Sequence, residues 1–210
     1  MEKIFKDKWK RYLFMGCLVL FVVIFGLFLF DLIYGFDVYI HSLIIKLNSN
    51  YVTYFFKFIT FFSSTYFIIF GVLLSLLLIK KKKTGMYIAL NAGLCCLINQ
   101  AIKFIVARPR PININMVEES GFSFPSGHSM MSVAFYGLLI YFISQKKWKK
   151  SRKILLSSLL MLLIFLIGVS RIYLGVHFAS DVLAGFALAT AYLLLFIELV
   201  FKKKKTNKVR

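Results

Sequence analysis

Several residue types are scarce in this chain of 210 residues, and each shortage excludes a class of protein. The cysteines are only three, Cys17, Cys95 and Cys96, and all lie in apolar runs. This odd number, without zinc-ligand spacing, excludes a disulfide framework and a structural zinc site. Only eight residues are acidic, and they form no cluster of carboxylates suited to Mg²⁺. Polar surface is also scarce, because 60% of the residues are hydrophobic, which excludes a soluble globule of this size.

What the chain has instead is apolar runs long enough to cross a bilayer, which takes about 20 residues as a helix. We predict an all-α bundle of six transmembrane helices forming a single domain over residues 1–210, with no internal repeat. The stretch from Asp31 to Asn50 mixes polar and apolar residues, and its apolar residues between Val38 and Leu47 predict a short helix at the membrane interface after the first span. The predicted spans cover approximately residues 12–30, 54–79, 86–107, 126–144, 154–169 and 178–201.

The positive charge is unevenly placed. Of the 27 basic residues, 21 lie in the N-terminal segment, the loops after the second and fourth spans, and the C-terminal tail. Six spans with both termini in the cytoplasm put all four segments on the cytoplasmic side, as the positive-inside rule requires. The net charge of +19 is therefore explained by membrane topology, and nucleic acid is not an expected partner.

Basic residues at the opposite, outer ends of the spans have no such explanation. They belong to three polar clusters: KFIVARPRP at 103–111, PSGH at 125–128 and SRIYLGVHFASD at 170–181. Each cluster alone has a simple structural explanation, as a membrane boundary, a helix N-cap or an interhelical hydrogen bond. The predicted topology brings all three clusters together on the outer rim of the bundle, which favours a binding site for an anion.

These residue types suit phosphate chemistry. Guanidinium groups such as that of Arg171 form paired hydrogen bonds with phosphate oxygens, and Lys103 adds a point charge. The amides around Ser126 and Gly127 form the positive end of a helix dipole, where the glycine allows close approach. The second arginine of the set is either Arg108 or Arg110, because each is followed by proline.

Two histidines supply groups that act as nucleophile, acid or base near neutral pH. His177 and Asp181 are four residues apart, so on a helix they share a face and the carboxylate can accept a hydrogen bond from one ring nitrogen. His128 belongs to the PSGH cluster. Glu118 and Glu119 are interpreted as solvated loop charges.

Together the three motifs resemble those of the type 2 phosphatidic acid phosphatase superfamily, the lipid phosphate phosphatases. Lys103 and Arg110-Pro111 match the first motif, Pro125 to His128 match the second, and Ser170-Arg171, His177 and Asp181 match the third. All three are intact and in order, and the family spacing favours Arg110 over Arg108.

The resemblance implies a role for each matching residue. His177 would be the nucleophile that forms a phosphohistidine, Asp181 would orient its ring, and His128 would act as general acid and then base. The phosphoryl oxygens would be held by Lys103, Arg110, Arg171, the Ser126 hydroxyl and the Gly127 amide. The reaction would be independent of metals and cofactors.

The expected partners are the bilayer and a lipid phosphate, such as undecaprenyl diphosphate, phosphatidylglycerol phosphate or phosphatidic acid, at the outer membrane face. The competing hypothesis is a non-catalytic protein that binds or transports a lipid headgroup. Capture of a headgroup requires cations but no nucleophile with an orienting carboxylate, and this difference favours the enzyme.

Overall fold

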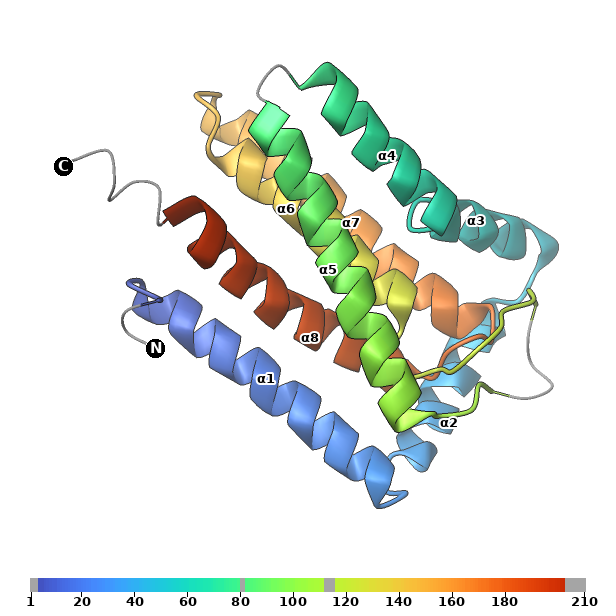
Figure 1. Cartoon of the computed structure of the whole chain (residues 1–210). Helices are drawn as coiled ribbons and strands as arrows, with labels where there is room; N and C mark the ends of the chain where they lie inside the picture. Colours follow the sequence, from blue (N-terminus) through green and yellow to red (C-terminus); the bar gives the residue numbers. More distant parts are fainter. Residues whose placement is uncertain (1–3, 80–81, 112–115, 203–210) are drawn as a thin grey trace.

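The computed structural model describes residues 4–79, 82–111 and 116–202. Lys3, Lys80, Lys81 and residues 203–210, which contribute to the charge pattern, lie outside the described residues. Within the described residues every regular element is a helix (Figure 1), which confirms the predicted fold class. The elements are α1 (Lys8–Leu29), α2 (Tyr34–Ile44), η1 (Ile45–Leu47), α3 (Asn50–Phe61), α4 (Thr65–Leu78), α5 (Lys82–Val106), α6 (Gly127–Ser144), α7 (Lys150–Tyr173), α8 (Ala179–Ile197) and η2 (Glu198–Lys202).

The second predicted span was wrong in one respect, because residues 54–79 do not form one continuous helix. Among the described residues, five helices are each long and apolar enough to cross a membrane. Helices α3 and α4 meet this condition only as a pair, which is bent by 40° at a short break. The break is stabilised by local hydrogen bonds. The Ser64 hydroxyl caps α4 by accepting from the amide of Phe67 at 3.3 Å, and the Ser63 hydroxyl donates to the carbonyl of Thr60 at 3.2 Å.

The third polar cluster was expected to lie between two spans, but most of it is helical. Ser170 to Tyr173 form the last turn of α7, and α8 already begins at Ala179. Residues 174–178 therefore make a tight connection, in which Gly175 adopts a φ of +72° that favours glycine. Because Arg171 lies in the last turn of α7 and Asp181 in the first turn of α8, this short connection holds the two residues at a fixed distance from each other.

Helices α6 and α8 lie at the centre of the bundle, and α1 lies at its edge. In the most apolar stretch of α8 and η2, 56% of the residues are buried, against 6% in α1. Small residues let the central helices approach closely, since a Cβ at Gly185 would lie 3.0 Å from the carbonyl oxygen of Ser126. The outward faces of α1, α4 and α7 carry large exposed apolar side chains, as expected for surfaces in contact with lipid.

The bundle has two distinct ends (Figure 1). The beginning of α1, the end of η2, the beginning of α5 and the connection between α6 and α7 lie at one end, and the described parts of these segments are rich in lysine. The carboxyl ends of α5 and α7 and the amino ends of α6 and α8 lie at the other end, beside α2. The three polar clusters therefore converge at the end opposite the beginning of α1.

Candidate active site

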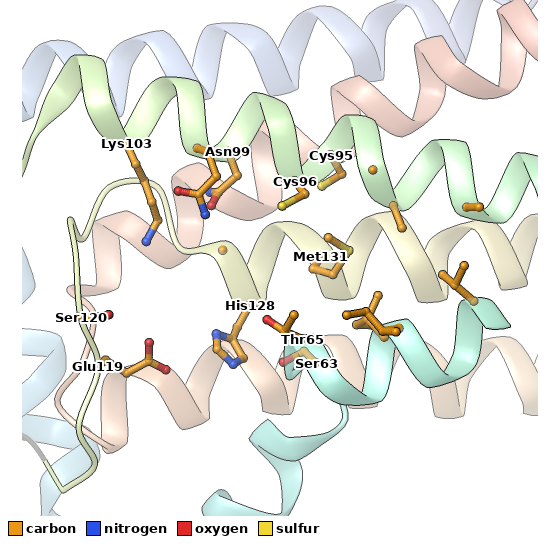
Figure 2. A pocket seen from close by; sticks show the side chains of 18 of the residues that line it. Ser63, Thr65, Cys95, Cys96, Asn99, Lys103, Glu119, Ser120, His128 and Met131 are labelled. Carbon is orange, nitrogen blue, oxygen red and sulfur yellow. The ribbon is translucent and has the colours of Figure 1, made fainter. Parts of the chain in front are cut away.

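A cavity of about 620 Å³ opens between α4, α5 and the amino end of α6 (Figure 2). Its polar end brings together five of the predicted site residues, which are Lys103, Arg110, Gly127, His128 and His177. The other three lie behind this lining, since Ser126 and Asp181 are 0% exposed and Arg171 is 1% exposed. The structure thus brings all eight predicted residues into one region, five at the cavity wall and three buried beside them.

His177 and Asp181 form the predicted pair, although by a different geometry. His177 precedes α8 rather than lying on it, and the Asp181 carboxylate in the first turn of α8 reaches back toward the ring. The distance between His177 Nδ1 and Asp181 Oδ2 is 3.5 Å. The same oxygen accepts from the backbone amide of Phe178 at 2.9 Å, as an acidic residue does when it caps a helix.

The other ring nitrogen of His177 points toward the cationic groups of the site. Arg110 Nη1 lies 3.2 Å from His177 Nε2. When Nδ1–H faces Asp181, Nε2 carries the lone pair, so the arginine donates to it. Burial lowers the pKa of His177 to about 4, and hydrogen bonding to Asp181 only partly opposes this. His177 is therefore neutral at pH 7, and its single Nε2 lone pair must be released by Arg110 before it can act as a nucleophile.

Arg110 and Lys103 line the same cavity as His177, and each is held by backbone carbonyls. Arg110 donates to the carbonyls of Val176, Gly121 and Ser120 at 2.8 to 3.0 Å, which ties the loop before α6 to the connection before α8. Lys103, in the last turn of α5, donates to the carbonyl of Phe122 at 2.6 Å.

Arg171 approaches the same region from α7. Its Nη1 donates to the hydroxyl of Thr60 at 2.8 Å, at the end of α3, beside the break in the second span. Among the described residues its Nε–H has no hydrogen-bond partner. A buried guanidinium with an unused donor is suited to binding an anion.

Sequence reasoning missed Glu119. Its carboxylate forms an ion pair with Arg171 and lies 3.6 Å from Arg110, so it contacts two of the predicted phosphate-binding cations. Burial raises the pKa of Glu119, but the two arginines outweigh this effect and the pKa lies below its ordinary value. Glu119 is thus ionised and not a solvated loop charge. Nothing in its spacing from the motifs indicated this contact.

The structure also separates Arg108 from Arg110. Arg108 Nη1 donates to Asp181 Oδ1 at 2.6 Å, and Nη2 donates to Asp37 at 2.8 Å. Its guanidinium carbon lies 4.8 and 4.1 Å from the ring centroids of Phe28 and Phe178. Arg108 therefore lies behind His177 and Asp181, while Arg110 faces the cavity, which agrees with the choice of Arg110 by motif spacing.

The second motif forms the beginning of α6. The Ser126 hydroxyl caps the helix and accepts from the hydroxyl of Ser129 at 3.0 Å, which leaves its own proton free to donate. Asn99 on α5 holds this turn by donating to the carbonyl of Pro125 at 3.1 Å. His128, in the first turn of α6, projects into the cavity opposite α5 (Figure 2).

Comparison with known proteins gives a consistent result. A sequence profile described as the PAP2 superfamily matches residues 83–205. Phosphatidylglycerophosphatase B of Bacillus subtilis (strain 168) is 37% identical over 126 residues, which cover 60% of this chain and 61% of the relative. Dolichyldiphosphatase of Saccharomyces cerevisiae is 30% identical over 156 residues, 69% of this chain and 65% of the relative. Each alignment spans less than two thirds of the relative's length.

Solved structures match over more of the chain. The crystal structure of a transmembrane PAP2 type phosphatidylglycerolphosphate phosphatase from Bacillus subtilis has a TM-score of 0.77 at 29% identity, covering 93% of this chain and 96% of the other. The structure of LpxE from Aquifex aeolicus has a TM-score of 0.61 at 27% identity, covering 78% and 94%. The similarity thus includes helices outside the matched profile.

Proposed function

Because the chain belongs to the PAP2 superfamily of membrane lipid phosphatases, we propose that it hydrolyses a lipid phosphate monoester or diphosphate through a phosphohistidine at His177. The observation that supports this most directly is the two-sided environment of His177. Asp181 faces one ring nitrogen, while the other nitrogen faces Arg110 at the cavity. This arrangement fixes a neutral imidazole with its lone pair directed at the position of a bound phosphoryl group.

In the first step, His177 Nε2 attacks phosphorus and the bond to the leaving oxygen breaks. His128 donates a proton to that oxygen, which leaves as the lipid alcohol or, from a diphosphate, as the lipid monophosphate. The phosphorylated imidazole carries positive charge, which the Asp181 carboxylate stabilises. In the second step His128 takes a proton from water, water attacks phosphorus, and the N–P bond breaks to release inorganic phosphate.

The phosphoryl oxygens are held by Lys103, Arg110 and Arg171, with the Ser126 hydroxyl and the Gly127 amide at the beginning of α6. Groups already fixed in position stabilise the charge that develops in the transition state. The buried Arg171 and Lys103 fit this role, because charges in a partly dry site interact more strongly than charges in water. With this charge set we propose that the reaction does not require a metal ion.

The lining of the cavity supports a lipid as the substrate. Its polar end holds the charged residues, and its other end, between α4 and α5, is lined by apolar side chains that include Ile68, Val72 and Ala92. An amphiphile with an acyl or prenyl chain fits such a cavity. Undecaprenyl diphosphate, phosphatidylglycerol phosphate and phosphatidic acid are therefore the proposed substrates of this single membrane phosphatase domain.

We place the site at the outer face of the cell membrane, with both termini in the cytoplasm. The lysine-rich segments at the terminal end of the bundle, including Lys82, Lys83, Lys146 and Lys147, support this orientation through the positive-inside rule. The headgroup of an outer-leaflet lipid would then reach the polar end of the cavity directly.

The test is release of inorganic phosphate by the purified protein in detergent, with excess chelator, across the three proposed lipids. We expect turnover on at least one of them and loss of both turnover and phosphoenzyme in His177→Ala. A phosphoenzyme in that variant would contradict the nucleophile assignment. Lipid binding without turnover on any substrate would favour the alternative, a non-catalytic protein that binds or transports a lipid headgroup.

A further inference from the structure

Asp37 and Arg108 form a buried ion pair directly behind the catalytic pair. Asp37, on α2, is 1% exposed, and Arg108, after α5, is 5% exposed. Arg108 Nη2 lies 2.8 Å from Asp37 Oδ2, while its Nη1 lies 2.6 Å from Asp181 Oδ1. One guanidinium thus bridges two carboxylates from different helices.

Ser180 closes this network. Its hydroxyl accepts from Arg108 Nη1 at 2.8 Å and donates to Asp37 Oδ2 at 2.7 Å. Its backbone amide donates to Asp37 Oδ1 at 2.8 Å, so Asp37 also binds the first turn of α8. Four polar groups from three segments therefore satisfy one another away from water, which fixes their geometry.

The two oxygens of Asp181 have separate partners. Oδ1 accepts from Arg108, while Oδ2 faces His177 Nδ1 and accepts from the hydroxyl of Ser123. Arg108 and His177 therefore lie at opposite oxygens of one carboxylate, and movement of Arg108 would rotate the carboxylate relative to the imidazole.

The charges of Asp37, Arg108 and Asp181 also favour a role for this network in catalysis. Two carboxylates and one guanidinium leave this network with one net negative charge before His177 is counted. If Arg108 had only Asp181 as its partner, the pair would be neutral and would stabilise a positive imidazole poorly. Asp37 shares the charge of Arg108, which leaves negative charge on Asp181 for the phosphorylated histidine.

We propose that Arg108 and Asp37 are positioning residues of the active site, in which Arg108 orients Asp181 toward His177 and Asp37 balances the charge of Arg108. This inference rests on the proposed function, since it assigns His177 as the nucleophile. Neither residue contacts the substrate in this scheme. The competing explanation is that the ion pair only holds α2 against α8.

The test compares Asp37→Asn with wild type in two measurements on the full-length protein in detergent. The first is the single-turnover rate of phosphoenzyme formation, and the second is the inhibition constant of inorganic phosphate. We expect the rate to fall by about 10- to 100-fold, the usual effect of losing a group that orients a reacting residue. The inhibition constant should stay within about twofold, since the cations that face the cavity are unchanged.

A matched control separates positioning from stability. Glu198 is a buried carboxylate at the other end of the α8 segment, 3.1 Å from Lys10. Glu198→Gln also weakens a buried ion pair, and we expect it to lower thermal stability while leaving the phosphorylation rate at the wild-type value. If both variants are destabilised alike and neither is slower, the ion pair is structural and the inference is wrong.

A second variant tests the charge balance. In Asp37→Asn/Arg108→Gln the guanidinium is removed too, so Asp181 regains its negative charge. We expect this double variant to stay slower than wild type, because Asp181 has lost its orienting partner, but to form phosphoenzyme faster than Asp37→Asn, whereas a purely structural pair predicts a rate no faster than that of the single variant. Where Asp37→Asn does not fold, Ser180→Ala replaces it, with a rate reduced by about threefold to tenfold. A wild-type rate in Ser180→Ala would overturn the inference.

The outcomes also distinguish this inference from the proposed function. Persistence of the phosphoenzyme in His177→Ala would refute the function itself. Its loss in His177→Ala, together with a wild-type rate in Asp37→Asn, would refute only the positioning role. An inhibition constant that rises as much as the rate falls would place Arg108 in phosphate binding instead, which also contradicts the inference.

Discussion

Arg108 and Arg110 are separated by a single proline, yet their guanidinium groups lie on opposite sides of the pair formed by His177 and Asp181. Arg110 contacts His177 Nε2 at 3.2 Å, and Arg108 contacts Asp181 Oδ1 at 2.6 Å. Two similar residues in one motif are thus expected to act differently. Arg110 should act on substrate, and Arg108 should act only through Asp181.

Arg110→Lys should therefore affect phosphate binding as well as rate. Lysine keeps the charge but lacks the planar fork that forms paired hydrogen bonds with phosphate. We expect kcat/KM to fall by about a hundredfold to a thousandfold and the inhibition constant of inorganic phosphate to rise about tenfold. Steady-state kinetics with the preferred lipid gives both values. Arg152→Lys is the control. Arg152 lies in the first turn of α7 beside Trp148, and the kcat/KM and inhibition constant of this variant should match those of wild type. An unchanged inhibition constant in Arg110→Lys would contradict this role.

Glu119→Gln should strengthen the binding of inorganic phosphate. The Glu119 carboxylate pairs with Arg171 and lies near Arg110, so a phosphate that binds both arginines must replace it. Glutamine keeps the shape and removes the competing charge. The Glu119 side chain is 26% exposed, so solvent screens part of the effect, and we expect the inhibition constant to fall by about threefold to tenfold.

Inhibition of turnover by added phosphate measures this effect, and the neighbouring Glu118→Gln is the control. Glu118 is exposed in the same loop and should leave the constant unchanged. Weaker phosphate binding in Glu119→Gln would show that the carboxylate supports the arginines rather than competing with the substrate.

Sequence patterns predicted the helical bundle and the convergence of three motifs, because long apolar runs and motif spacing are local properties of the chain. They did not reveal the contacts of Glu119 and Asp37. Glu119 reaches Arg171 across 52 positions, and Asp37 reaches Arg108 across 71 positions. Pairing over such separations depends on how the helices pack, and the composition and motif spacing of the sequence do not predict that packing. The break between α3 and α4 was missed for a related reason, since a few polar residues in an apolar run also fit a continuous span.

The pH dependence of kcat/KM should reflect the buried His177. Its pKa in the folded protein is about 4, against 6.5 for an ordinary histidine, because burial disfavours the charged ring. The charged or titratable groups around it are Asp181 on α8, Arg171 on α7, Arg110 and Glu119 before α6, and His128 on α6. The nucleophile must be neutral, so activity should be retained as pH falls through 6.5 and should decline near pH 4.

The same shift has a consequence for stability. Between pH 6.5 and about 4 the unfolded chain binds a proton at His177 that the folded protein does not. The contribution of the lowered His177 pKa to the free energy of unfolding is therefore fully present above pH 6.5 and decreases as pH falls toward 4. Thermal unfolding of wild type and His177→Gln across this range measures it, and the variant should lose less stability on acidification. Equal losses in the two proteins, or an acid limb of kcat/KM near pH 6.5, would contradict the buried neutral state.

The proposed orientation predicts which single cysteines react with an impermeant thiol reagent in intact cells. In a variant with the three native cysteines replaced by serine, Tyr51→Cys should react from outside. Tyr51 is 88% exposed at the beginning of α3, near the end of the bundle that carries the site (Figure 1). Lys147→Cys, in the exposed connection between α6 and α7, should react only after lysis. The two positions control for each other. Reaction of Lys147→Cys but not of Tyr51→Cys in intact cells would place the site in the cytoplasm. Reaction of both in intact cells would show that the membrane was broken.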